Sequence, residues 1–145
     1  MRGSLPFTSR GRTARLARLH RFDGMRGKDI RRIVRAGRPG RVRARTMITV
    51  QDGPADGTYI LLSGSAEVFL DGTNIGTLLP GDLVGEIAVI AGEPRTASVE
   101  ATCDLEVLHF PVDVTNRLFV DVPPFRRALL DTARERLAQD QARRE

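Results

Sequence analysis

The sequence predicts a mainly β fold with α-helices before and after it. Apolar residues recur at helical spacing over 14–36, alternate with a period of two over 41–110, and return to helical spacing over 111–142. Many short strands at close intervals, separated by turn residues, are typical of a β-sandwich or a small barrel. The length of 145 residues suits one domain with one core.

The first part of the chain is expected to be a disordered tail followed by two short helices. Residues 1–13 are polar and basic and contain Gly, Pro and Ser, a composition typical of an unstructured segment. Two apolar stripes at helical spacing follow, the first with Leu16, Leu19 and Phe22 and the second with Ile30, Ile33 and Val34. We therefore expect N-terminal helices over 14–37, separated at Asp23-Gly24 and ended by Gly37 and Pro39.

The middle of the chain, residues 41–110, is expected to hold the strands. The segments with strand patterns are 41–50, 59–62, 66–70, 74–79, 97–101 and 103–110. Turn signals such as Asp56-Gly57 and Asp71-Gly72 lie between them.

The last part, residues 111–142, is expected to return to helix. A short helix is predicted from Pro111 to about Val120, and Pro123-Pro124 interrupts it because prolines remove backbone donors. A longer helix is predicted over 125–142, with an apolar stripe of Phe125, Leu129, Ala133 and Leu137. We assign 14–145 to a single domain.

The composition is that of a soluble globular protein, with 41% hydrophobic and 28% charged residues. No apolar run has the length of a membrane span or of a signal peptide. Cys103 is the single cysteine, so an internal disulfide is excluded, in agreement with a reducing compartment. We expect a cytoplasmic protein without a membrane span.

The net charge of +5 conceals a strong asymmetry. Residues 1–45 carry 15 Lys and Arg against two Asp, a net charge of +13, whereas the remaining residues carry 8 basic and 16 acidic side chains, a net charge of −8. Such a block can attract nucleic acid, an anionic membrane surface or an acidic partner. The alternative is a GC-rich coding bias, because 22 of the 23 basic residues are Arg.

Residues 81–98 carry the pattern with a chemical meaning. Gly85 precedes a segment able to form a helical turn, whose free N–H groups would attract an anion. Arg95 would complete a pocket for one phosphate through charge-assisted hydrogen bonds. The Glu86 carboxylate would repel that phosphate unless it accepts a hydrogen bond from a neutral hydroxyl, such as a ribose 2′-OH. One phosphate, one hydroxyl and an apolar surround fit a cyclic nucleotide.

This stretch resembles the phosphate-binding cassette of cyclic-nucleotide-binding domains, as found in cAMP-dependent kinase regulatory subunits, bacterial catabolite activators and cyclic-nucleotide-gated channels. The matching residues are Gly85-Glu86-Ile87-Ala88 and Pro94-Arg95-Thr96-Ala97-Ser98-Val99. The resemblance implies that Glu86 takes the ribose 2′-OH and Arg95 the exocyclic phosphate oxygens. It also implies that backbone N–H groups near Ile87, Ala88 and Ala97 complete the phosphate cradle.

The resemblance covers about residues 15–140 and implies an eight-stranded jelly-roll-like β-barrel, with N-terminal helices and C-terminal hinge and lid helices. Val68 and Leu78 match strand positions that line the base, and Arg136 matches a lid position on the last helix. Ordinary core packing for the first two, and a solvated helix face for Arg136, are the competing interpretations.

The resemblance implies a sensor that binds cAMP or cGMP, needs no cofactor or metal and is not an enzyme. The Thr96 hydroxyl permits cGMP without requiring it, and we favour cAMP. Ligand binding is expected to move the C-terminal helix, which then meets a protein effector that the sequence does not name.

Three other hypotheses remain. A degenerate domain would keep the fold and bind nothing, although such domains usually lose the Glu or the Arg. A metal-binding catalytic barrel needs more His than His20 and His109. A transcription regulator needs a helix-turn-helix, for which the residues after Val112 leave no room. Non-specific nucleic acid contact by the arginine-rich segment 10–45 is the remaining partner hypothesis.

Overall fold

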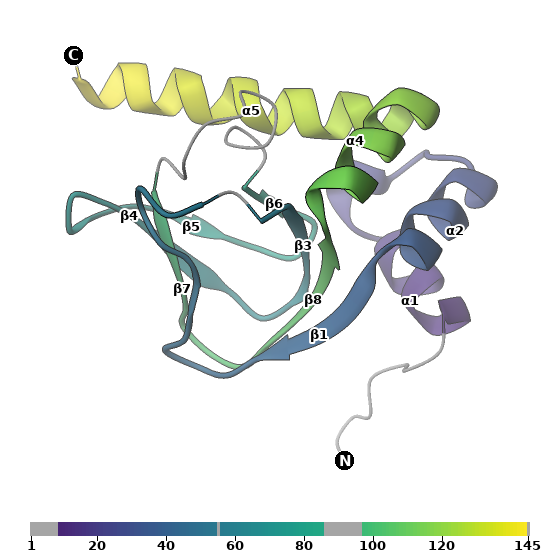
Figure 1. Ribbon diagram of the computed structural model, residues 1–145, viewed down its shortest axis with the longest axis horizontal. Coiled ribbons are helices and arrows are strands. Elements are labelled where there is room, and N and C mark those ends of the chain that lie inside the picture. Colours follow the sequence, from purple (N-terminus) through teal and green to yellow (C-terminus); the bar gives the residue numbers. More distant parts are fainter. Residues whose placement is uncertain (1–8, 55, 86–96, 145) are drawn as a thin grey trace.

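The computed structural model describes residues 9–54, 56–85 and 97–144, and it has two antiparallel four-stranded sheets covered on one side by helices (Figure 1). The helical elements are α1 (Ser9–Leu16), the 3₁₀ turn η1 (His20–Phe22), α2 (Gly27–Ala36), α4 (Val112–Asp121) and α5 (Pro123–Arg144). The strands are β1 (Arg38–Val42), β2 (Met47–Thr49), β3 (Thr58–Ser63), β4 (Ala66–Leu70), β5 (Thr73–Leu78), β6 (Leu83–Val84), β7 (Ser98–Ala101) and β8 (Leu105–Phe110).

The two sheets pack face to face as a sandwich. The first, called sheet A, has the strand order β1-β8-β3-β6, and the second, sheet B, has the order β2-β7-β4-β5. The mainly β, jelly-roll-like class with eight strands is confirmed for the described residues, but closure into a barrel is not. In the described part of the chain each sheet has four strands, and no strand pairing joins one sheet to the other. Apolar side chains fill the space between the sheets, as in a β-sandwich.

Sheet A is buried on both faces because it forms the middle layer. Ile60 of β3, with Leu108 and Phe110 of β8, packs against the helices in one apolar cluster. Leu61 and Val107, the alternate residues on the same strands, pack against sheet B in a second cluster. Successive side chains of a strand point to opposite faces, so the continuous apolar run of β3 supplies both clusters.

The predicted element boundaries are confirmed in part. Helix α2 ends at Ala36, before Gly37, as expected, and α4 and α5 are separate helices, but α5 starts at Pro123 and not at 125, because prolines are tolerated in the first turn of a helix. The expectation of disorder through residue 13 was wrong for its last part, because α1 starts at Ser9. Leu16 at the end of α1 is fully buried in the helix-side cluster, and this tertiary contact outweighs the polar composition of the helix.

Two strands differ from the predicted pattern. Strand β1 begins at Arg38 and includes Pro39, and proline is tolerated on a strand at the edge of a sheet, which is the position of β1. Strand β6 was not predicted at all. It has two residues, which pair with Tyr59 and Ile60, and two residues are too few to display a period.

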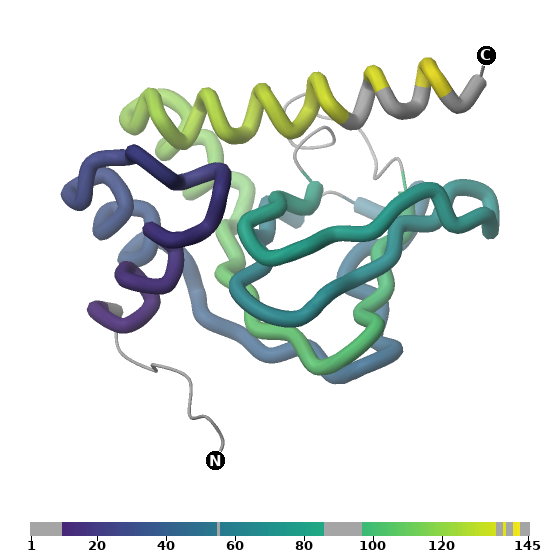
Figure 2. The backbone as a smooth tube through the Cα atoms, turned by 180° about the vertical axis from the view of Figure 1, so that it is seen from behind, coloured from purple at the N-terminus to yellow at the C-terminus, as the bar shows by residue number. Residues whose placement is uncertain are grey.

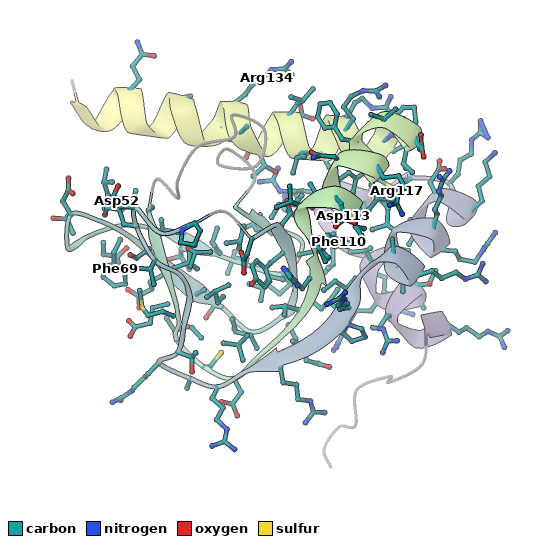
Figure 3. The ribbon with its side chains drawn as sticks, in the orientation of Figure 1. Asp52, Phe69, Phe110, Asp113, Arg117 and Arg134 are labelled. Carbon is teal, nitrogen blue, oxygen red and sulfur yellow. The ribbon has the colours of Figure 1, made fainter. Side chains whose placement is uncertain are left out.

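Figures 1 and 2 both show α5 as a long helix that runs along one side of the sandwich. Its inner stripe of Phe125, Leu129 and Ala133 is buried, as the sequence spacing predicted. Phe110 of β8 meets Phe125 edge to face, with ring centroids 5.8 Å apart (Phe110 is labelled in Figure 3). The N-terminal part of α5 is therefore anchored on the helix side of sheet A.

Candidate functional site

The candidate site is the cassette, residues 81–98, which carries the chain from sheet A to sheet B. It contains β6 of sheet A near its start and begins β7 of sheet B at its end. Five predicted site residues lie outside the described residues: Glu86, Ile87, Ala88, Arg95 and Thr96. The structure describes the two ends of the cassette and the surfaces next to them.

Gly85 leaves sheet A in a conformation that suits glycine. Its φ is +87°, in the left-handed region that costs an L-residue about 1–2 kcal/mol. The preceding residue, Val84, is buried and pairs with Tyr59 of β3. The chain therefore turns sharply directly after a strand that is anchored in the sheet.

The other end of the cassette is held by side-chain hydrogen bonds from the β2 region. The Thr49 hydroxyl donates to the Ala97 carbonyl at 3.3 Å, and the Gln51 backbone N–H donates to the Ser98 hydroxyl at 2.9 Å. Ser98 and Val99 then pair with β4 opposite Phe69 and Val68. This end is thus fixed on sheet B from two sides.

The structure brings Val68, Leu78 and Ala97 into one apolar cluster between the sheets. Val68 and Leu78 are 6% and 5% exposed, and Ala97 is partly buried against the same cluster. Val84, next to Gly85, belongs to this cluster as well. Both described ends of the cassette therefore meet one apolar cluster between the sheets, and we call its residues Val68, Leu78 and Ala97 the apolar wall.

Arg136, the predicted lid residue, lies on α5, but its side chain is outside the described part of the structure. Its neighbour Glu135 takes part in a contact that sequence analysis missed. Arg21 of η1 donates two hydrogen bonds to Glu135, Nη1 to Oε2 at 2.8 Å and Nη2 to Oε1 at 3.0 Å. A two-point contact of this kind fixes orientation as well as distance.

The same guanidinium also holds the start of the cassette. Arg21 Nε donates to Asp82 Oδ1 at 3.2 Å, and the Leu79 N–H donates to Asp82 Oδ2 at 2.8 Å. Hydrogen bonding to Glu135, with the charges of Asp82 and Glu135, raises the pKa of Arg21 despite the opposing effect of burial. Arg21 therefore joins η1, the cassette and α5, and we call the set Arg21, Asp82 and Glu135 the Arg21 clamp.

No sequence signal marked the Arg21 clamp, because Arg21 stands among many arginines and its partners are 61 and 114 residues away in the chain. A cavity of about 560 Å³ lies next to the clamp, between residues 20–25 and α5. Its walls carry acidic and basic side chains in similar number, including Asp23, Arg127 and Asp131. This cavity is on the helix side and is distinct from the apolar wall between the sheets.

A second feature missed by sequence analysis lies beside Gly85. The rings of Tyr59 and His109 stack with centroids 4.5 Å apart and an interplanar angle of 26°. The Tyr59 hydroxyl donates to Asp56 Oδ2 at 3.0 Å. Because Tyr59 pairs with both His109 and Val84, this stack supports the strand from which the cassette departs.

Within 9–54, 56–85 and 97–144, no three His, Cys, Asp or Glu side chains are grouped to hold a metal ion. No described helix combines the length and apolar character needed to cross a bilayer.

Comparison with known protein families identifies the class of this domain. Residues 39–121, more than half of the chain, match the model of the cyclic nucleotide-binding domain. The chain therefore belongs to the cyclic nucleotide-binding domain family. The matched range includes the whole cassette and the strands of both sheets, and it starts one residue after the beginning of β1.

Particular relatives agree with this assignment. The chain is 36% identical over 73 residues to a cAMP-dependent protein kinase regulatory subunit of Emericella nidulans, covering 49% of this chain and 18% of that protein. The regulatory domain of Toxoplasma gondii PKA with cAMP has a TM-score of 0.74 at 26% identity, covering 88% of this chain and 50% of that one. The regulatory subunit of a cAMP-independent protein kinase A from Trypanosoma brucei has a TM-score of 0.76 at 17% identity, covering 91% and 48%.

The alignments with curated relatives are local. The chain spans about a fifth of the length of the first of these relatives. The shared part lies within the cyclic nucleotide-binding domain.

Proposed function

We propose that this protein is a cyclic-nucleotide sensor that binds cAMP in preference to cGMP and is not an enzyme. The observation that carries the proposal is the meeting of both cassette ends at the apolar wall of Val68, Leu78 and Ala97, in a chain of the cyclic nucleotide-binding family. The base would rest on this wall. The relatives named as cAMP-dependent kinase regulatory subunits support the preference for cAMP.

The proposed ligand contacts follow the chemistry of the cassette. Arg95 supplies the counter-charge for the phosphate, and the backbone N–H groups near Ile87, Ala88 and Ala97 add uncharged donors. Glu86 accepts a hydrogen bond from the ribose 2′-OH. Thr96 adds a hydroxyl near the base, and Arg136 on α5 covers it from outside.

The proposed response is a change in the position of α5. Ligand shifts an open–closed equilibrium only to the extent that it binds one state better than the other. The Arg21 clamp supports this proposal because it links the start of the cassette to α5 through one side chain. The moved helix would then contact a protein effector, in the cytoplasm.

A domain of this fold that responds to another ligand, or to none, is the second candidate. The observation in its favour is the similarity to a regulatory subunit described as cAMP-independent, which shares the fold at 17% identity. Retention of Glu86 and Arg95 in the cassette argues for the cAMP sensor.

The test is ligand binding by calorimetry with cAMP, cGMP and 5′-AMP, using the protein and its Arg95→Ala variant. Removing one partner of a buried charge pair costs about 2–5 kcal/mol, so Arg95→Ala is expected to weaken cAMP binding by roughly 30-fold or more. The matched control is Arg117→Ala, which removes an exposed arginine on α4 whose ion-pair partner, Asp113, is 4.0 Å away (both are labelled in Figure 3).

Binding of cAMP by the protein and by Arg117→Ala, with loss in Arg95→Ala, supports the proposal. An unchanged affinity in Arg95→Ala places the phosphate elsewhere. No binding of any cyclic nucleotide by the folded protein rejects the sensor and favours the second candidate.

A further inference from the structure

Helix α2 carries a basic stripe opposite its buried stripe. Ile30, Ile33 and Val34 are at most 2% exposed and pack in the helix-side cluster. The exposed cations of α2, at the spacing i, i+3, i+4 and i+7, are Lys28, Arg31, Arg32 and Arg35. At 100° per residue these four positions fall on the face opposite the core. The apolar face of α2 is therefore buried in the core, and the opposite face presents positive charge to solvent.

Strand β1 and the turn after it extend this positive face. Arg38 begins β1 directly after α2, and Arg43 and Arg45 follow at the end of the strand, all three exposed. Strand β1 is an edge of sheet A, so these side chains have no neighbouring strand on one side. We call Lys28, Arg31, Arg35, Arg38, Arg43 and Arg45 the basic surface.

None of the six side chains of the basic surface forms an ion pair with a carboxylate within the described part of the chain. The ion pairs found there involve other arginines, such as Arg15 with Glu106 and Arg32 with Asp121. Six cations without an ion-pair partner, on α2, at the start of β1 and in the turn after β1, create a positive potential that attracts a polyanion. Side chains with blue nitrogen ends project into solvent around α2 and along β1 in Figure 3.

The residue types favour phosphate groups over a lipid surface. Five of the six cations are arginine, whose planar fork matches phosphate geometry. A helix that inserts into a membrane surface needs a free apolar face, and that of α2 is in the core. The exposed large apolar side chains of the described residues, Met47, Val50, Leu79, Val112 and Val120, all lie off α2 and β1.

The absence of aromatic residues from α2 and β1 favours a duplex over single strands. Proteins that hold unpaired bases stack them on aromatic side chains, and residues 27–42 contain none. Contacts with a duplex backbone need only cations that match its regular phosphates. We propose that the basic surface binds the phosphate backbone of double-stranded nucleic acid, without sequence preference.

This surface is separate from the nucleotide pocket proposed above. Helix α2 packs in the cluster on the outer side of sheet A, whereas Val68 and Leu78 belong to the cluster between the sheets. Sheet A lies between the cations of α2 and that cluster, whereas Arg43 and Arg45 lie in the turn that leads from β1 to β2. The inference therefore stands whether or not the protein binds cAMP.

The experiment is fluorescence anisotropy of a short labelled DNA duplex titrated with the protein at salt concentrations from roughly 50 to 200 mM. The variant is Arg31→Ala/Arg35→Ala, and the matched control is Arg127→Ala/Arg134→Ala, which removes two exposed arginines from α5. Removing two phosphate contacts is expected to reduce the slope of log K against log salt by about 2 and to weaken binding roughly tenfold at low salt. Circular dichroism checks that each variant is folded.

A steep salt dependence that is reduced in Arg31→Ala/Arg35→Ala and kept in the control supports the proposal. Absence of duplex binding at low salt, or equal losses in both variants, rejects it. Polyglutamate or vesicles with anionic lipid serve as competitors. If either displaces the duplex at matched charge concentration, the partner is an acidic protein or a membrane, and the assignment to nucleic acid is wrong.

Discussion

Gly85 and Gly76 differ in the backbone angle φ, and this difference decides whether the position requires glycine. Gly85 has a φ of +87° at the point where the cassette leaves β6. Gly76 lies on β5 without a positive φ, and a Cβ placed on it would meet no atom within 4 Å. The first position demands glycine, whereas the second accepts a side chain.

We expect Gly85→Ala to destabilise the protein by about 1–2 kcal/mol, the cost of holding an L-residue in the left-handed region. Gly76→Ala should be neutral or slightly stabilising, because alanine has less backbone freedom to lose. Urea unfolding of both variants measures the difference. Equal stability of the two variants would contradict the strained turn at Gly85.

At the scale of elements, α5 is attached to the rest of the domain in two ways. Its first half buries Phe125 and Leu129 against the helix-side cluster. Farther along, Glu135 meets Arg21 in the clamp, and the Arg21 side chain is 12% exposed while that of Glu135 is 53% exposed. The first attachment is apolar and fully buried, and the second is a polar contact that a small movement of α5 would break.

Arg21→Ala is expected to destabilise the protein by about 1–3 kcal/mol, because Asp82, only 14% exposed, loses a charged hydrogen-bond donor. Hydrogen exchange of the α5 amides after residue 130 should accelerate more than that of β3. The control, Arg134→Ala, removes an exposed i,i+3 pair with Asp131 and should change stability by less than about 0.5 kcal/mol. Uniform acceleration in α5 and β3 would show that the clamp does not act locally on α5.

Titration of Arg21 does not weaken the Arg21 clamp at ordinary pH. The pKa of Arg21 is raised above its ordinary, strongly alkaline value, so its contribution to stability is complete below that ordinary value and is lost only in still more alkaline solution. Within the pH range in which proteins fold, the guanidinium stays charged.

At the scale of the whole molecule, β8 couples the two cores. Leu108 points into the helix-side cluster, and its neighbour Val107 points into the cluster between the sheets. Strand β8 also pairs with both β1 and β3. Loss of either core would expose one face of the strand that supports the other, so the layers should unfold together.

We expect a single cooperative unfolding transition. Leu108→Ala should lower the free energy of unfolding by about 2–5 kcal/mol. Circular dichroism at the helix band follows the outer layer, and fluorescence of Tyr59, the single tyrosine in a chain without Trp, follows sheet A. The two signals should give coincident midpoints in the protein and in the variant. Separate midpoints would mean that the helical layer unfolds independently of the sandwich.

Much of the fold was predictable because it depends on local patterns. The alternating strands, the helical spacing of Ile30, Ile33 and Val34, and the interruption at Pro123-Pro124 all express constraints carried by neighbouring residues. Strand β6 was not predictable, since its two residues become a strand only through pairing with β3. The start of α1 at Ser9 similarly depends on burial of Leu16.

The class of the domain follows from the sequence alone, because a glycine, a carboxylate and an arginine stand in a fixed order within 18 residues, whereas the ligand-binding roles proposed for them stay a prediction. The tertiary structure adds that the strands form two open sheets, that Val68, Leu78 and Ala97 share one apolar wall, and that Arg21 joins the cassette to α5. These are contacts between residues far apart in the chain. Which residues meet in these contacts depends on how the layers pack in space, and the spacing of residues along the sequence does not show it.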